Sequence, residues 1–149
     1  MQVFIILVLF FYSMLLSGCH APSTESNIEM ADTNIALAMN YFQQQQLDLV
    51  KEYLTRAKNT APNYAVVWSS LAYYAEKIGD AAKADAYYQH AIQLAPHSGA
   101  IHNNYGVFLC HQKKYMMAIK QLMIAAQEPD YLNREMANRN IKICRLQRL

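Results

Sequence analysis

Residues 65–98 read AVVWSSLAYYAEKIGDAAKADAYYQHAIQLAPHS, and their pattern recurs at one fixed spacing both before and after this stretch. The positions that share this spacing are occupied by Ala57, Ala91 and Ala125, by Val50, Ala84 and Ala118, by Leu54, Tyr88 and Leu122, and by Pro62 and Pro96. Proline ends helices, because it lacks an N–H and disfavours helix in the preceding residue. A period of about 34 residues is typical of stacked repeat architectures.

The spacing and residue types resemble the tetratricopeptide repeat, in which each unit forms two antiparallel helices. In the quoted stretch the family pattern is kept at Trp68, Leu71, Ala72, Ala84, Tyr88, Ala91 and Pro96. The resemblance implies an all-α solenoid. We expect three helix-turn-helix repeats within residues 32–130, at about residues 31–64, 65–98 and 99–130, followed by a basic capping helix at residues 131–149.

Small residues recur where the two helices of each repeat should cross. Ala38, Ala72 and Gly106 share one repeat position, and only a small side chain there allows close approach of the helices. Gly79 lies between the two expected helices of the second repeat, where its freedom to adopt positive φ suits a tight turn.

Residues 131–149 carry one more helical pattern, with five Lys or Arg residues and one Glu. Its apolar positions are Leu132, Met136, Ile141, Ile143 and Leu146. We interpret it as a capping helix, because the terminal units of solenoids need a polar outer face. A docking surface for an acidic partner or an anionic lipid is the alternative.

Residues 3–16, VFIILVLFFYSMLL, form an uncharged run that ends just before Cys19. A membrane span needs about 20 apolar residues, whereas the apolar region of a signal peptide has about 7–15. Residues 16–19, Leu-Ser-Gly-Cys, resemble the lipobox of bacterial lipoproteins. This resemblance implies a signal peptide over residues 1–18 and an acyl and diacylglycerol lipid, including palmitate, on Cys19. An uncleaved anchor and a buried core helix are the alternatives.

Residues 19–31 are polar and rich in turn formers, so we expect a flexible tether after the lipidated cysteine. In lipoproteins of Gram-negative bacteria, an Asp after this cysteine commonly retains the protein at the inner membrane. His20 stands there in this chain. The resemblance therefore implies the periplasmic face of the outer membrane.

Charge and motifs exclude several classes of function. The net charge of +2 over 149 residues does not indicate nucleic-acid binding. The charge is uneven, with net −3 over residues 1–98 and net +5 over residues 99–149, which indicates a polarised surface. The sequence has no glycine-rich phosphate loop, nucleophile elbow or HExxH motif. We therefore expect no enzyme activity, no small-molecule substrate and no cofactor.

The histidines and cysteines have structural interpretations. The histidines are irregularly spaced, so we expect no metal site: His20, His90, His97, His102 and His111. Cys110 and Cys144 lie one repeat period apart, at one position of successive first helices. Neighbouring helix axes lie about 8–10 Å apart, whereas a disulfide requires Cα atoms within about 7 Å. We therefore expect two free thiols.

A protein-binding groove is the main site that the repeat pattern predicts. Arrays of this family usually bind peptides on a concave face built from first helices. By repeat position, the candidate residues are Ile35, Met39, Phe42, Val66, Ser69, Tyr73, Lys77, Asn103, Val107, Cys110 and His111. Met39, Phe42 and Tyr73 form an apolar strip that suits a hydrophobic segment. Alternatively, some of these side chains only cover the tether or the cap.

The third repeat narrows the resemblance to the type IV pilus biogenesis and stability lipoproteins, the PilF/PilW-type pilotins. The matching residues are Asn103, Asn104, Tyr105, Gly106, Gln112, Lys113, Tyr115, Ala118, Leu122, Tyr131, Arg134 and Asn140. The resemblance implies a non-enzymatic protein that helps the outer-membrane secretin reach its membrane and assemble into multimers. Family members carry about six repeats, so we expect a shortened or specialised relative. A general envelope scaffold for another secretion or cell-wall complex is the alternative.

Overall fold

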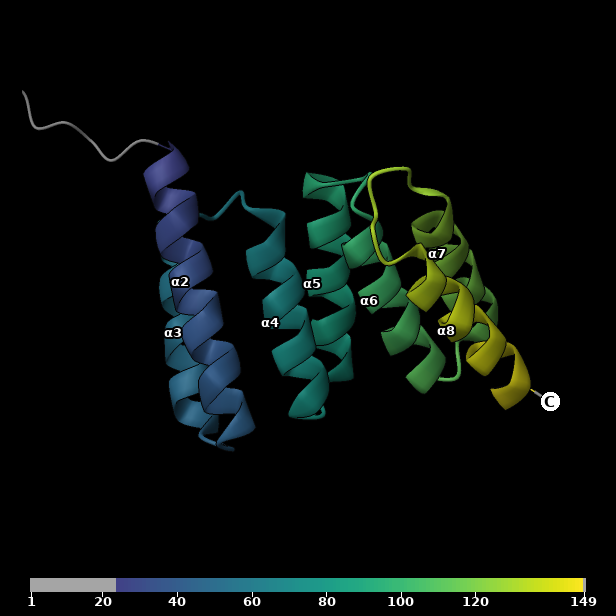
Figure 1. Cartoon of the computed structure of the whole chain (residues 1–149). Coiled ribbons are helices and arrows are strands. Elements are labelled where there is room, and N and C mark those ends of the chain that lie inside the picture. The colour runs from purple at the N-terminus through teal and green to yellow at the C-terminus, as the bar shows by residue number, and fades with distance from the viewer. Residues whose placement is uncertain (1–23, 149) are drawn as a thin grey trace, which may run out of the picture.

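The computed structural model describes residues 24–148, which form seven helices and contain no strand. In chain order the helices are α2 (Thr24–Gln43), α3 (Leu47–Thr60), α4 (Ala65–Lys77), α5 (Ala81–Leu94), α6 (Gly99–His111), α7 (Tyr115–Gln127) and α8 (Arg134–Gln147). Helices α2 and α3, α4 and α5, and α6 and α7 form three helical hairpins in a row (Figure 1), and α8 packs at the end of the array. The expected all-α repeat solenoid is confirmed.

The hairpins stack in two layers. The first-helix layer consists of α2, α4, α6 and α8, and consecutive members contact one another. The second-helix layer consists of α3, α5 and α7, and no two of these described helices have Cα atoms within 8 Å of each other. The second-helix layer is therefore splayed outwards, so that the first-helix layer forms the concave face of the array.

The repeated small residues lie where the sequence pattern predicts. Ala38 and Ala72 have no exposed surface. A Cβ atom on Gly106 would lie 2.6 Å from Cγ of Leu122, so α6 and α7 approach too closely even for alanine. Close helix packing thus explains the small residue at this repeat position.

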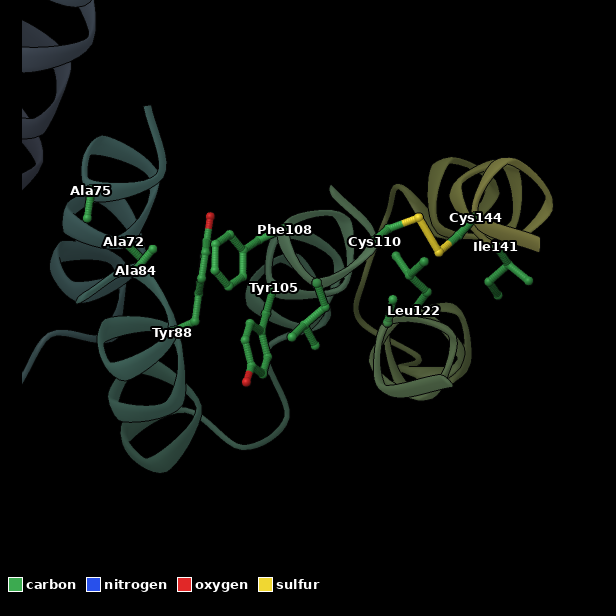
Figure 2. Close-up of a cluster of buried hydrophobic side chains, with 12 residues drawn as sticks. Ala72, Ala75, Ala84, Tyr88, Tyr105, Phe108, Cys110, Leu122, Ile141 and Cys144 are labelled. Carbon is green, nitrogen blue, oxygen red and sulfur yellow. A yellow bond between two sulfur atoms is a disulfide. The ribbon is translucent and has the colours of Figure 1, made fainter. Parts of the chain in front are cut away.

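Figure 2 shows the largest core cluster, which joins the second repeat to the third. Tyr88 of α5 packs against Tyr105 and Phe108 of α6, with ring centroids 5.4 and 5.5 Å away. Aromatic pairs at such distances contribute about 0.5–1.5 kcal/mol beyond the burial of their area. Tyr88, which is almost fully buried, therefore fills the space between the second and third repeats.

The turn inside each repeat needs one residue with positive φ. Gly79 has φ of +82°, as expected for the second repeat. Gln45 and Lys113, at the equivalent positions of the first and third repeats, have φ of 60° and 59°. Only the middle repeat has glycine there, and the other two accept a conformation that costs L-residues about 1–2 kcal/mol.

The boundary of the expected tether is wrong, because α2 already begins at Thr24. Ile28, Ala31, Ile35 and Ala38 continue one helical stripe into this segment, and Ala31 is fully buried. Residues 24–31 are therefore part of the first repeat. The tether was predicted from the polar residues of this segment, which lie on the exposed side of the helix.

The last helix buries few of the apolar residues in its helical pattern. Of these five residues only Ile141 is buried, whereas Leu132 is 96% exposed and Leu146 is 70% exposed. The buried face of α8 consists of Ala137, Ile141 and Cys144. This face is narrow because α8 packs only on α6 and α7 among the described helices.

The expected signal peptide, Cys19 and His20 lie outside the described residues. Within residues 24–148, none of the helices combines the length and apolar character needed to span a membrane.

Candidate functional site

The predicted groove residues come from α2, α4 and α6 of the concave layer. Those with partly or largely exposed side chains are Ile35, Met39, Phe42, Val66, Tyr73, Lys77, Val107 and His111. Ser69, Asn103 and Cys110 are buried. These three present almost no surface to a partner, because their side chains lie between helices.

The apolar strip of Met39, Phe42 and Tyr73 crosses the boundary between the first and second repeats. Phe42 and Tyr73 have ring centroids 5.5 Å apart. Met39 and Phe42 pack partly on the core cluster of the first repeat, while Tyr73 stays 36% exposed. The strip therefore joins buried apolar packing to accessible aromatic surface.

A cation extends this strip along α4. The ammonium nitrogen of Lys77 lies 5.0 Å from the centroid of the Tyr73 ring. Cation–π contacts at exposed sites are worth about 0.5–1 kcal/mol. The contact holds a positive charge at the edge of the apolar strip, where it can meet an anionic group of a bound segment.

The strip ends at a polar link between α4 and α6. Nδ1 of His111 lies 3.0 Å from Oε1 of Glu76. The Glu76 side chain is only 12% exposed, whereas that of His111 is 53% exposed. The sequence pattern identified His111 as a groove residue but missed Glu76, because Glu76 is not at a position of the repeat pattern.

The expectation of two free thiols is wrong, because Cys110 and Cys144 form a disulfide with Cα atoms 5.8 Å apart. The error came from using the distance between helix axes for the distance between Cα atoms. Cα atoms lie about 2.3 Å from their helix axis. Two that face each other are therefore up to ~4.6 Å closer than the axes.

Asn103 makes a second link between the same two helices. The Nδ2 amine of Asn140 donates a hydrogen bond of 2.9 Å to Oδ1 of Asn103. The two links join α8 to α6 from positions about one helical turn apart on α8. Asn103 and Cys110 therefore have structural partners within the chain.

The last helix adds groove residues that the sequence analysis assigned to a cap. Asn140, Ile143 and Gln147 line a pocket of about 140 Å³ together with Val107, Cys110, His111 and Leu122. The spacing of Cys110 and Cys144 by one repeat period could have revealed this, since it places α8 in the register of a first helix. The concave face thus extends over four helices.

The described histidines have local partners within the protein. Buried His102 lies between Oε1 of Gln121, 2.6 Å away, and the carbonyl oxygen of Pro96, 2.9 Å away. His90 packs edge-on against Trp68. Among residues 24–148, no group of three or more His, Cys, Asp or Glu side chains could hold a metal ion. The chemistry that this arrangement supports is the binding of a protein segment.

Comparison with known proteins identifies the repeat and a set of relatives. Residues 65–98 and 87–120 match family models described as tetratricopeptide repeat. An uncharacterised Haemophilus influenzae protein is 33% identical over 135 residues, which cover 89% of this chain and 75% of that protein. The type IV pilus assembly protein PilF of Pseudomonas aeruginosa is 26% identical over 147 residues, covering 94% of this chain and 58% of PilF.

Two solved structures share the fold. The structure described as the functional characterisation of Pseudomonas aeruginosa PilF has a TM-score of 0.76 and 29% identity. It matches 81% of this chain, which spans 55% of that structure. The TPR2B domain of yeast Sti1, solved in complex with pHsp70, has a TM-score of 0.68 and covers 80% of this chain and 96% of its own. At 19% identity this second match shows the fold alone.

Proposed function

The chain belongs to the tetratricopeptide-repeat family that includes the Haemophilus influenzae relative, and on this premise we propose that it acts in type IV pilus biogenesis. It is a protein-interaction module related to PilF. In the proposed function it is an outer-membrane lipoprotein on the periplasmic face, and it assists secretin localisation and multimer assembly without catalysing a reaction.

The observation that carries this proposal is the match to PilF together with the accessible strip on the concave face. The match extends over most of this chain, although the chain spans little more than half of PilF. Met39, Phe42 and Tyr73 lie within the matched repeats and offer aromatic surface beside the Lys77 cation. Aromatic side chains are enriched among the residues that dominate binding energy at protein interfaces.

The disulfide supports an exported protein. Disulfides persist in oxidising compartments such as the bacterial periplasm and are rare in the cytosol. Cys110 of the third repeat and Cys144 of α8 form one. This agrees with the lipobox-like residues 16–19 and with a lipid on Cys19 as the anchor. A membrane anchor would confine the search for a membrane-bound partner and raise the effective concentration.

A deletion strain tests the function. We expect loss of secretin multimers on deletion and their return when the wild-type chain is supplied. A Tyr73→Ala chain should restore fewer multimers at equal abundance. Gln93→Ala, on the exposed side of α5, is the matched control and should restore them fully. Intact multimers and piliation in the deletion strain would instead favour the general envelope scaffold.

Crosslinking identifies the partner at the groove. A photoreactive amino acid at Tyr73 should capture the secretin, whereas the same group at Gln93 should not. Equal capture from both positions would contradict binding through the concave face.

The anchor requires a separate variant. Cys19→Ser should abolish palmitate labelling and release the protein from outer-membrane fractions. Unchanged membrane association would show that residues 3–16 remain as an anchor. Because Cys19 is far from the groove in sequence, this result is independent of the partner's identity.

A further inference from the structure

A cleft lies on the opposite layer of the array from the concave groove. No Cα atom of α3 lies within 8 Å of a Cα atom of α5, and a cleft of about 210 Å³ opens between the two helices over α4. Its lining residues are Lys51, Thr55, Lys58, Leu71, Tyr74, Ala75, Ile78, Lys83 and Tyr87. We refer to this set as the lysine cleft.

The charged side chains that line the lysine cleft have one sign. Lys51 and Lys58 approach it from α3 and Lys83 approaches it from α5, and no Asp or Glu is among the lining residues. Like charges that converge across a cleft repel one another. Such an arrangement therefore favours binding of an anion.

Two of the three ammonium groups have partners within the chain. Nζ of Lys83 lies 3.1 Å from Oδ2 of Asp80, outside the lining set. Their hydrogen bond raises the pKa of Lys83, which stays protonated. Nζ of Lys58 lies 5.7 Å from the centroid of the Trp68 ring. Among residues 24–148, the Lys51 ammonium has neither an ion pair nor a hydrogen bond, so its charge is available to a ligand.

The repeat architecture does not require lysine at these positions. The residues one repeat period after Lys51, Lys58 and Lys83 are Asp85, Ile92 and Met117. The equivalent junction between the second and third repeats thus has an acid and two apolar side chains. The three lysines are a property of the first junction, and repeat packing alone does not explain them.

The second junction has a larger side chain at one of the cleft positions. Tyr105 takes the position of Leu71, and its hydroxyl donates a hydrogen bond of 3.0 Å to Oδ1 of Asp85. Burial raises the pKa of Tyr105 to about 12, so this hydroxyl keeps its proton. At the first junction the smaller Leu71 leaves space between Tyr74 and Tyr87, both partly buried.

We propose that the lysine cleft binds an acidic peptide segment of a protein partner, with one apolar or aromatic side chain inserted between Tyr74 and Tyr87. Carboxylates of the segment meet Lys51 and Lys83, and the inserted side chain packs on Leu71. The volume suits one side chain, since pockets for drug-sized ligands measure about 300–1,000 Å³. The cleft lies outside the concave groove and does not depend on the proposed pilus role.

Three short peptides test the proposal by NMR. The full ¹⁵N-labelled chain, in uncharged detergent that dissolves residues 3–16, is titrated with acetyl-Glu-Phe-Glu-amide, acetyl-Gln-Phe-Gln-amide and acetyl-Glu-Ala-Glu-amide. We expect the first peptide to shift the amides of Thr55, Tyr74 and Lys83 with millimolar affinity. The second, without charge, and the third, without the ring, should each bind at least fivefold more weakly.

Matched variants separate the cleft from general charge attraction. Lys51→Gln should weaken binding of the first peptide at least threefold, whereas Lys142→Gln on α8 should leave it unchanged. The spectra also report whether each variant is folded. Equal weakening by both variants, equal binding of the uncharged peptide, or shifts centred on Tyr73 and Val107 of the groove would overturn the proposal. Loss of the secretin function would not affect this result.

Discussion

The two outer pairs of neighbouring first helices, α2–α4 and α6–α8, occupy equivalent places in the array but are joined by different interactions. The first pair meets through the rings of Phe42 and Tyr73. The second pair is joined by the Cys110–Cys144 disulfide and by the hydrogen bond from Asn140 to Asn103. The α2–α4 contact is apolar and partly accessible. The α6–α8 contact consists of a disulfide and a hydrogen bond and is largely buried.

The difference follows from what surrounds each pair. Helix α4 also packs against α5, its partner in the hairpin, whereas α8 contacts only α6 and α7 among the described helices. In a solenoid each unit is stabilised by its neighbours, so a helix with fewer neighbours needs stronger individual links. The α2–α4 pair can keep exposed aromatic surface for a partner because packing elsewhere stabilises it.

Removal of the disulfide should have the largest effect on this comparison. In the chain-entropy description, a crosslink that closes a loop of this length is worth about 4 kcal/mol, and the two cysteines have a sequence separation of 34. We expect a reductant to lower the free energy of unfolding in urea by a comparable amount. Amide exchange should accelerate first in α8.

The Cys110→Ser/Cys144→Ser double variant is the control for this measurement. It should have the stability of the reduced protein and should not respond to reductant. If reductant left the wild-type stability unchanged, the disulfide would not be what stabilises the α6–α8 pair.

The next largest effect on stability should come from Gly99 of α6, which packs against Tyr131 in the loop before α8. A Cβ atom on Gly99 would lie 2.5 Å from Cβ of Tyr131, which is buried. Ala65 occupies the equivalent position in α4 and already has a Cβ atom. Gly99→Ala should therefore cost about 2 kcal/mol in urea unfolding, within the ~1–3 kcal/mol that overpacking costs. Ala100→Gly, at an exposed neighbouring position, measures the helix-propensity difference, which alone would make Gly99→Ala stabilising. A neutral or stabilising Gly99→Ala would therefore refute the packing argument.

The hydrogen bond between α8 and α6 should contribute less. Asn140→Ala leaves the buried Oδ1 of Asn103 without its donor. An unsatisfied buried group costs about 1–3 kcal/mol, and alanine recovers part of this through its higher helix propensity. We expect a net loss of about 1 kcal/mol by urea unfolding. Asn138→Ala, exposed on the same helix, should be neutral or slightly stabilising.

The fold could be predicted because the repeat period is preserved at buried positions. Ala57, Ala91 and Ala125 are fully buried, so their regular spacing directly records the packing of successive repeats. The start of α2 could not be predicted from composition, because polar residues such as Glu25 and Glu29 lie on its exposed side. The helical spacing of Ile28 and Ala31 carried that information instead.

The site was predictable in part for a related reason. Repeat position identifies which residues face the concave layer, so Phe42 and Tyr73 were found. It does not identify cross-repeat links such as Glu76–His111, which depend on side-chain reach between helices. The disulfide could not be predicted from the distance between helix axes. It depends on the Cα–Cα distance, which is short only because Cys110 and Cys144 face each other.

Truncation of Tyr73 should have the smallest effect on stability and the clearest effect on binding. Its ring contacts Phe42 and Lys77 but remains 36% exposed. Loss of one aromatic pair costs about 0.5–1.5 kcal/mol, and the exposed position places Tyr73→Ala at the low end of this range. Urea unfolding should therefore change by about 0.5 kcal/mol, while capture of the partner, measured here as its co-purification with the chain, falls severalfold. Asn140→Ala costs more stability, because it removes a hydrogen bond between α6 and α8. It should nevertheless reduce capture of the partner less than Tyr73→Ala does. If capture instead followed stability across both variants, the α2–α4 pair would have no special role in binding.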